Sequence, residues 1–138
     1  MGSAYTNNFV GALTTTLYDI DSSLDILVIQ NPPNNGSLNT VGALGFNTSD
    51  LVGFDISSAG IALASLTAPA GNASQLFTIN LATGAAALVG TIGGGVPLTS
   101  LAAAPSVVPE PASLALVSLA LGSIAIVVRA RRSQANAK

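Results

Sequence analysis

The chain has 138 residues, of which only 7% are charged, and it contains neither cysteine nor histidine. These absences exclude disulfides, Cys/His zinc sites and every mechanism that needs a thiolate or an imidazole. All six acidic residues lie at or before residue 110, and all four basic residues follow residue 128. Residues 1–110 therefore have no cation to neutralise phosphates, and we expect them not to bind nucleic acid.

Residues 1–104 are predicted to form an all-β domain. Short runs of β-branched, leucine and aromatic residues alternate there with Gly, Asn, Pro and Ser, without helical periodicity. Asn34-Asn35-Gly36 and Ala82-Thr83-Gly84 are typical of tight turns. Eight strands are predicted, over residues 14–20, 25–30, 37–44, 51–56, 60–66, 75–80, 85–92 and 97–103.

The predicted domain also contains an internal repeat. Leu17-Tyr18-Asp19-Ile20-Asp21 matches Leu76-Phe77-Thr78-Ile79-Asn80, 59 residues later. Val41-Gly42-Ala43-Leu44-Gly45 matches Val89-Gly90-Thr91-Ile92-Gly93, only 48 residues later, and we assign the difference of 11 to an insertion at residues 31–36 of the first unit. Repeats of this length with several strands each indicate two propeller-blade-like antiparallel units.

These segments, together with Asn31-Pro32-Pro33-Asn34-Asn35-Gly36, resemble an uncharacterised family of bacterial exported proteins, a domain of unknown function with propeller-like repeats. The resemblance spans most of residues 5–104 and implies a fold but no activity. Closed propellers have about four to eight blades, and residues 1–25 carry no basic and apolar secretory signal. We therefore expect the chain to be the C-terminal part of a longer exported protein with further blades upstream.

Asp19-x-Asp21-x-Ser23-x-Asp25 has the spacing that begins a calcium loop. Leu24 stands where that loop needs glycine, and Gln30 stands where it needs the bidentate glutamate. On a strand, Tyr18 and Ile20 would face the core, whereas Asp19 and Asp21 would face water. We expect solvated strand and turn aspartates, with a calcium site as the alternative.

We expect no enzyme activity and no cofactor. Paired carboxylates can perform acid–base chemistry, but no histidine or cysteine is present to assist them, and the only lysine is Lys138. Gly93-Gly94-Gly95 lacks the Lys and Ser/Thr of a phosphate-binding loop and is interpreted as a connection between strands.

After a Pro-rich linker at residues 105–111, residues 112–128 form an uncharged apolar run. At a helical rise of about 1.5 Å per residue the run reaches roughly 25 Å, near the thickness of a bilayer core. Leu, Ala, Ile and Val surround any helix drawn through it, so it predicts a single transmembrane helix rather than the alternative, a buried core helix. Arg129, Arg131 and Arg132 begin a basic tail, residues 129–138, which should stay in the cytoplasm.

Val108-Pro109-Glu110-Pro111, followed by the apolar run and the arginine cluster, resembles a PEP-CTERM sorting signal. The resemblance covers the last 25–30 residues or so. It implies an exported bacterial protein whose tail an exosortase, a membrane cysteine transpeptidase, recognises and cleaves near the motif. The alternative interpretation is that Pro109 and Pro111 only cap the helix.

The sequence thus predicts a non-enzymatic surface or extracellular-matrix protein. Its expected partners are an exosortase, membrane lipid through residues 112–128 and extracellular polysaccharide. The precursor would sit in the inner membrane with its body outside, and processing would release it to the cell surface or matrix. The alternatives are a permanently tail-anchored protein whose β domain binds an unknown partner, and a propeller enzyme whose site lies in upstream blades.

Overall fold

The computed structural model describes residues 1–104, so the predicted linker, span and basic tail at 105–138 lie outside the described residues. The described chain is all-β, and it contains no helix long and apolar enough to cross a membrane. Eight strands form two four-stranded antiparallel sheets. The first sheet contains β1 (Gly2–Tyr5), β2 (Leu17–Asp21), β3 (Ile26–Gln30) and β4 (Leu38–Ala43); the second contains β5 (Val52–Ile56), β6 (Ala62–Leu66), β7 (Gln75–Ile79) and β8 (Ala86–Thr91).

Seven of the eight predicted strands are confirmed, but the strand predicted at 97–103 is wrong. Pro97 has no N–H to give to a ladder, and the N–H groups of Leu98 and Ala103 donate to side-chain oxygens instead. Strand β1 was not predicted, because Gly-Ser-Ala-Tyr has a weak β signal. Pairing with β2 and burial of Ala4 hold it in place.

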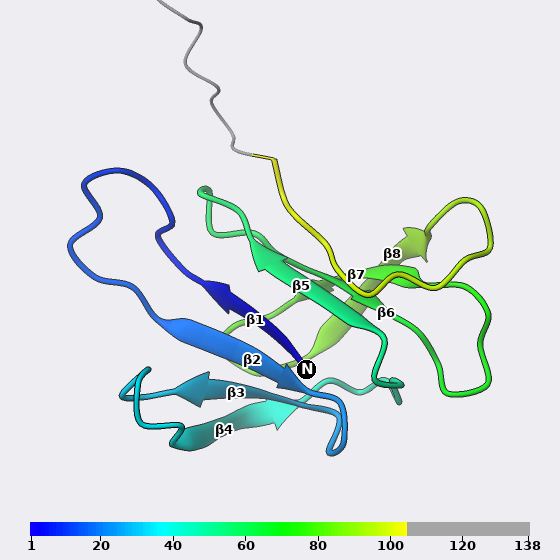
Figure 1. Ribbon diagram of the computed structural model, residues 1–138, viewed down its shortest axis with the longest axis horizontal. Coiled ribbons are helices and arrows are strands. Elements are labelled where there is room, and N and C mark those ends of the chain that lie inside the picture. The colour runs from blue at the N-terminus through cyan, green and yellow to red at the C-terminus, as the bar shows by residue number, and fades with distance from the viewer. Residues whose placement is uncertain (105–138) are drawn as a thin grey trace, which may run out of the picture. The chain divides into compact units, whose positions relative to one another are not determined.

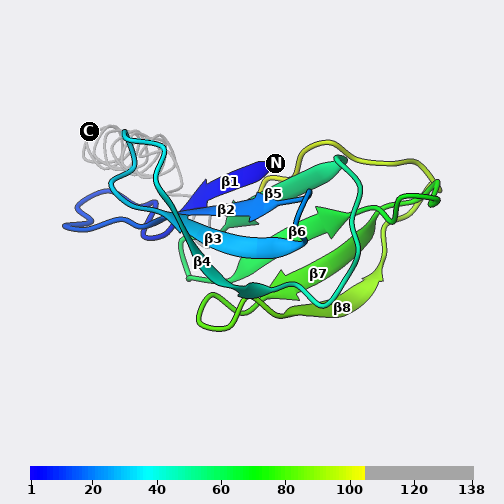
Figure 2. The ribbon, with the colours of Figure 1, turned by 90° about the horizontal axis from the view of Figure 1, so that it is seen from below.

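Each sheet is a simple meander in which consecutive strands are neighbours, in the orders β1-β2-β3-β4 and β5-β6-β7-β8 (Figure 1). The first strands of the two sheets, β1 and β5, lie side by side. Figure 2 shows both sheets running from these first strands on one side of the picture to β4 and β8 on the other.

The hydrophobic core fills the space between the two sheets. Alternation along each strand selects the residues that enter it, since successive side chains point to opposite faces. Ile20 and Leu27 come from the first sheet, and Phe54, Ala64 and Phe77 from the second, and all are at most 5% exposed. The phenyl ring of Phe46 packs on Phe77 with ring centroids 4.7 Å apart.

The strand registers correct the predicted repeat. One row of paired residues crosses the first sheet, and its equivalent crosses the second: Gly2–Ile20–Leu27–Gly42 and Gly53–Ser65–Leu76–Gly90. A β-bulge follows Leu27 in the first row and Leu76 in the second. Strands β4 and β8 are therefore equivalent, as the 48-residue match indicated. The 59-residue match is wrong, because it equates the second strand of one sheet, β2, with the third strand of the other, β7.

The predicted insertion at residues 31–36 is also wrong. The β3–β4 connection has seven residues, 31–37, and the β7–β8 connection has six, 80–85. The two sheets differ instead in the connection between their first and second strands, which spans residues 6–16 in the first sheet and 57–61 in the second. The longer loop reaches the other sheet, since the Asn8 side-chain amide donates to the Ile56 carbonyl over 2.7 Å.

Candidate functional site

Residues 96–104, here called the exit segment, carry the chain from the second sheet toward the sorting signal. The Leu98 N–H donates to Ser74 Oγ and the Ala103 N–H donates to Asp55 Oδ2, each over 2.7 Å. Ser74 Oγ is itself 2.7 Å from the buried hydroxyl of Thr67. Figure 1 shows the exit segment following β5 before it leaves the domain. The side chains of Asp55, on β5, and Ser74, in the β6–β7 connection, thus hold the backbone of the exit segment.

Gly53 allows the exit segment to lie directly against β5. A Cβ at this position would stand 2.5 Å from the carbonyl carbon of Ser100 and 2.6 Å from the amide nitrogen of Leu101. Both of these neighbours are backbone atoms, which cannot swing aside as the end of a side chain could. Only glycine therefore fits at the centre of this contact.

Asp55 uses both carboxylate oxygens on backbone donors. Oδ1 accepts the Ile56 N–H over 2.9 Å, while Oδ2 accepts the N–H of Ala103, 48 residues later in the chain. Hydrogen bonds to an ionised acceptor are stronger than those between neutral groups. Asp55 is thus bonded at once to its own strand and to the exit segment.

The aspartates of the candidate calcium loop have separate partners. Asp21 Oδ1 accepts both the N–H and the hydroxyl of Ser23, at 2.9 and 2.6 Å, and these bonds lower the pKa of Asp21. Asp25, which has a φ of 56°, accepts the Thr48 N–H over 2.9 Å. Within residues 1–104 no three acidic side chains are grouped so that they could hold a metal ion. The described geometry gives the calcium alternative no support.

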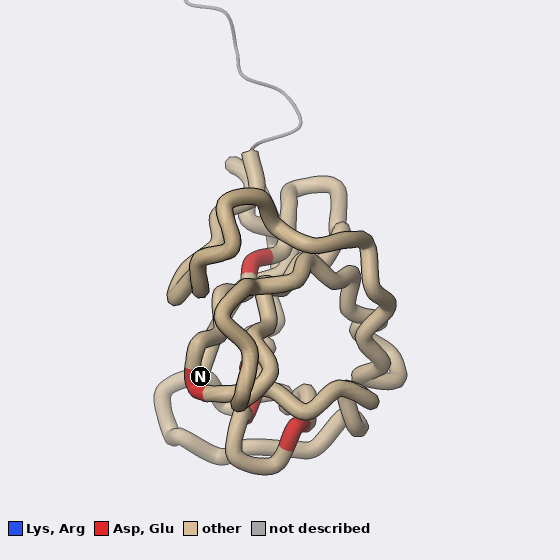
Figure 3. Tube along the Cα trace, turned by 90° about the vertical axis from the view of Figure 1, so that its right-hand side faces the viewer, with Lys and Arg blue, Asp and Glu red and all other residues tan. Residues whose placement is uncertain are grey.

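The expectation that Asp19 faces water is wrong, because its side chain is only 2% exposed. β2 is an interior strand of its sheet, and Asp19 lies between Ser3 on β1 and Val28 on β3, which shield it. Its Oδ2 atom has no hydrogen-bond partner among the described residues. Figure 3 shows acidic residues but no Lys or Arg in the described part of the chain.

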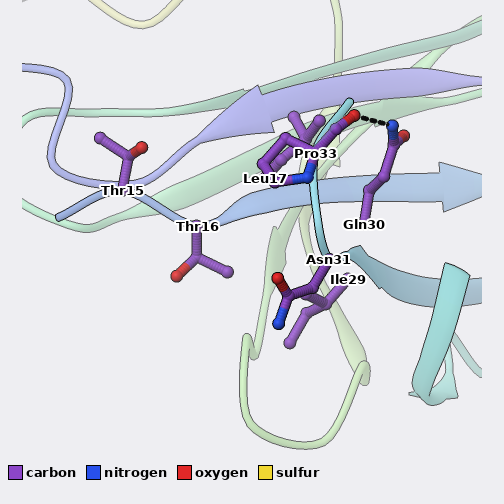
Figure 4. A pocket seen from close by; sticks show the side chains of 7 residues that line it. All are labelled: Thr15, Thr16, Leu17, Ile29, Gln30, Asn31 and Pro33. Carbon is purple, nitrogen blue, oxygen red and sulfur yellow. Dashed lines mark hydrogen bonds between the residues drawn. The ribbon is translucent and has the colours of Figure 1, made fainter. Parts of the chain in front are cut away.

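A cavity of about 130 Å³ lies at the start of β2 and the end of β3 (Figure 4). The Gln30 side-chain amide donates to the Pro33 carbonyl across it. Its lining offers hydroxyl, amide and apolar groups without any titratable side chain: Thr15, Thr16, Leu17, Ile29, Gln30, Asn31 and Pro33. Such a lining can hydrogen-bond a small neutral group but cannot perform acid–base catalysis.

The residues predicted to carry the sorting signal lie outside the described residues. They are Val108, Pro109, Glu110, Pro111, Arg129, Arg131 and Arg132. Sequence reasoning missed the residues that hold the exit segment. Asp55 falls inside a predicted strand and Ser74 in a loop, and their bonds to the segment join positions 48 and 24 residues apart. No local pattern reports contacts over such separations.

Comparisons with known proteins identify both parts of the chain. Residues 107–132 match the PEP-CTERM protein-sorting motif, so the chain is exported, has a C-terminally membrane-anchored precursor, and is sorted to the cell surface with an exosortase as processing partner. No curated protein and no solved structure matches the chain. Residues 1–102 match the family described as Domain of unknown function (DUF4394), and the chain therefore belongs to that family.

Proposed function

We propose that this chain is a non-enzymatic surface or extracellular-matrix protein that an exosortase processes near residues 108–111. The observation that carries the proposal is the match to the sorting motif at 107–132, with Pro-Glu-Pro, an apolar run and an arginine cluster in that order. Before processing, residues 112–128 span the inner membrane in contact with lipid, the body lies outside, and Arg129, Arg131 and Arg132 stay in the cytoplasm.

Each part of the signal has its own physical role. Pro109 and Pro111 fix φ at two of three positions, so Pro109-Glu110-Pro111 is stiff and extended and loses little entropy when an enzyme groove binds it. The span holds this triplet near the membrane surface, within reach of a membrane-embedded transpeptidase. The arginines resist translocation and retain the tail until cleavage.

The chemistry of the body supports a role without catalysis. The whole chain lacks histidine and cysteine. In the described part, Asp21, Asp25 and Asp55 are engaged with backbone N–H groups, and the cavity at Gln30 has a neutral lining. Neutral hydroxyl and amide groups suit hydrogen bonding to sugars, and we propose extracellular polysaccharide as the environment of the mature protein.

We further propose that the two sheets are successive blades of a propeller-type repeat. The supporting observation is that one packing relation recurs. Gly2 begins the first row, and a Cβ there would meet Val52 and Phe54 of the next sheet. Gly53 begins the second row, and a Cβ there would meet Ser100 and Leu101 of the exit segment. Each sheet thus receives the next piece of chain at the same place, as successive blades do around a common axis.

The sorting role is tested by replacing Pro109-Glu110-Pro111 with three alanines in the exported full chain, in a bacterium that carries an exosortase. The hydrophobicity of residues 112–128 is unchanged, so we expect normal insertion but accumulation of full-length precursor in the membrane. Immunoblots of membrane and released fractions measure this, with Pro32-Pro33 replaced by alanines as a control for proline loss elsewhere. Shortening and release at the normal rate would reject the proposal and favour a permanently tail-anchored protein.

A further inference from the structure

We propose that Asp55 and Ser74 form a clamp on the exit segment, and that this clamp opens before the exosortase processes the chain. The proposal rests on the proposed sorting function and adds a role for the body in it. Asp55 and Ser74 are positioning residues, since they act on the backbone that leads to the cleavage motif.

The clamp is built from hydrogen bonds that differ from those of a sheet. A strand at the edge of a sheet is held by a ladder of backbone bonds. The exit segment instead gives the N–H groups of Leu98 and Ala103 to the side chains of Ser74 and Asp55. Few bonds have to break for the segment to leave, so it is a part of the domain that can open locally without global unfolding.

The two anchors differ in how firmly the domain fixes them. Ser74 is fully buried, and its hydroxyl also contacts Thr67, so the Leu98 end is tied into the interior. Asp55 is only partly buried, and its bond to Ala103 is the more C-terminal of the two bonds of the clamp. Opening therefore begins at Asp55 and frees residues 99–103 first.

The clamp sets how many residues separate its last bond, at Ala103, from the motif. Only residues 104–108 lie between Ala103 and Pro109, and five residues can span at most about 18 Å when fully extended. Enzymes that bind peptides as extended strands engage the backbone on both sides of the bond they cleave. The Ala103 N–H cannot serve such a groove while it is bonded to Asp55. Release of the clamp at Asp55 adds residues 99–103 to the five residues between the last bond and the motif.

Asp55→Ala tests the clamp in the full chain. The variant loses the Ile56 bond within β5 and the Ala103 bond of the clamp. Only the Ala103 bond holds the exit segment, so we expect the open form to become about tenfold more populated and precursor shortening to accelerate by up to that factor. Asp50→Ala is the matched control, because it removes the same charge from a residue that binds Ser22 instead of the exit segment. Pulse-chase labelling in a bacterium with an exosortase measures the rates, and thermal unfolding checks that both variants fold.

A second variant keeps Asp55 intact. Inserting five Gly and Ser residues between Ala104 and Pro105 lengthens the free chain without touching the clamp, and we expect similar acceleration. Combined with Asp55→Ala, the insertion should add little further acceleration, a non-additivity that general destabilisation would not produce. Hydrogen exchange of the purified precursor in detergent should show faster exchange at Ala103 in Asp55→Ala and not in Asp50→Ala.

The outcomes separate this inference from the proposed function. If the wild-type chain is shortened as fast as Asp55→Ala and the insertion variant, the clamp is rejected. The proposed function is not affected by that result. Unchanged exchange at Ala103 in Asp55→Ala also overturns the clamp, whatever the processing rate. If the wild-type chain itself is never shortened in a host that processes another exosortase substrate, the proposed function fails, and the role of the clamp in processing fails with it.

Discussion

At the scale of single residues, the described part of the chain holds its acidic side chains without any basic side chain. Its five aspartates have no Lys, Arg or His within residues 1–104 to pair with. Asp21, Asp25 and Asp55 each accept backbone N–H groups at turns or at the exit segment. Backbone donors fixed by a turn can stabilise a carboxylate much as a cation would. The acidic residues therefore contribute to local structure rather than to ion pairs.

Asp21 should make stability depend on pH in the acid range. Its hydroxyl and N–H bonds from Ser23 hold its pKa below the ordinary value, so the folded state favours the ionised form. This stabilisation is complete above the ordinary pKa of an aspartate, about 4, and is lost as pH falls through the lower folded pKa. Asp21→Ala should therefore lower stability slightly at pH 7 and not at pH 2.

Urea unfolding of the full chain in detergent at several pH values measures this difference. The effect should be small, under about 1 kcal/mol, because Asp21 is partly exposed and solvent screens it. Asp21→Asn is the control, since its side-chain oxygen can still accept the Ser23 N–H while carrying no titratable charge. A gap between wild type and Asp21→Ala that widens below pH 4 would contradict the assigned sign.

At the scale of elements, the equivalent rows of the two sheets have different surroundings at their outer ends. Gly42 of β4 and Gly90 of β8 occupy the same place, each paired with the leucine before a bulge. A Cβ on Gly42 would run into the carbonyl oxygen of Thr83 in the β7–β8 connection, whereas a Cβ on Gly90 would have no atom of residues 1–104 within 4 Å. The first sheet is therefore covered at this end by the β7–β8 connection, whereas no part of residues 1–104 covers the second sheet at Gly90.

This difference predicts opposite results for two identical substitutions. Gly42→Ala should destabilise the domain by about 1–3 kcal/mol, because the β7–β8 connection must move to admit the methyl group. Gly90→Ala, the matched control at the equivalent position, should change stability by less than about 0.5 kcal/mol. Thermal or urea unfolding of both variants measures the two changes in stability. Equal changes would contradict the inferred difference in packing around Gly42 and Gly90.

Local sequence patterns predicted most of the elements but not their arrangement. Period-two alternation and turn residues located seven strands, since both signals lie within a few residues of each other. The repeat was assigned to the wrong strands because Leu17-Tyr18-Asp19-Ile20-Asp21 and Leu76-Phe77-Thr78-Ile79-Asn80 look alike, although one is a second strand and the other a third. Burial of Asp19 and the bonds of Asp55 depend on distant segments, which a local pattern cannot report.

At the scale of the whole molecule, charge is segregated along the chain. The six acidic residues precede the apolar run at 112–128, and the four basic residues follow it. Basic residues next to a membrane span stay on the cytoplasmic side, because positively charged segments resist translocation. The body has no such residue to hold it inside, so this distribution favours one orientation: residues 1–110 outside and 129–138 inside.

Reporter fusions test this orientation in the exported full chain. Alkaline phosphatase, which is active only outside the cytoplasm, should be inactive when fused after Lys138, whereas a cytoplasmic fluorescent protein fused there should fluoresce. Phosphatase inserted after Ala104 should be active, which controls for export of the body.

Replacing Arg129, Arg131 and Arg132 with serine leaves the span's hydrophobicity intact and removes three of the four basic residues. We expect this variant to show phosphatase activity after Lys138 in part of the population, since the asymmetry that fixes the tail is then nearly gone. Strong phosphatase activity after Lys138 in the wild-type chain would contradict the orientation, and with it the argument that the arginines retain the precursor for the exosortase.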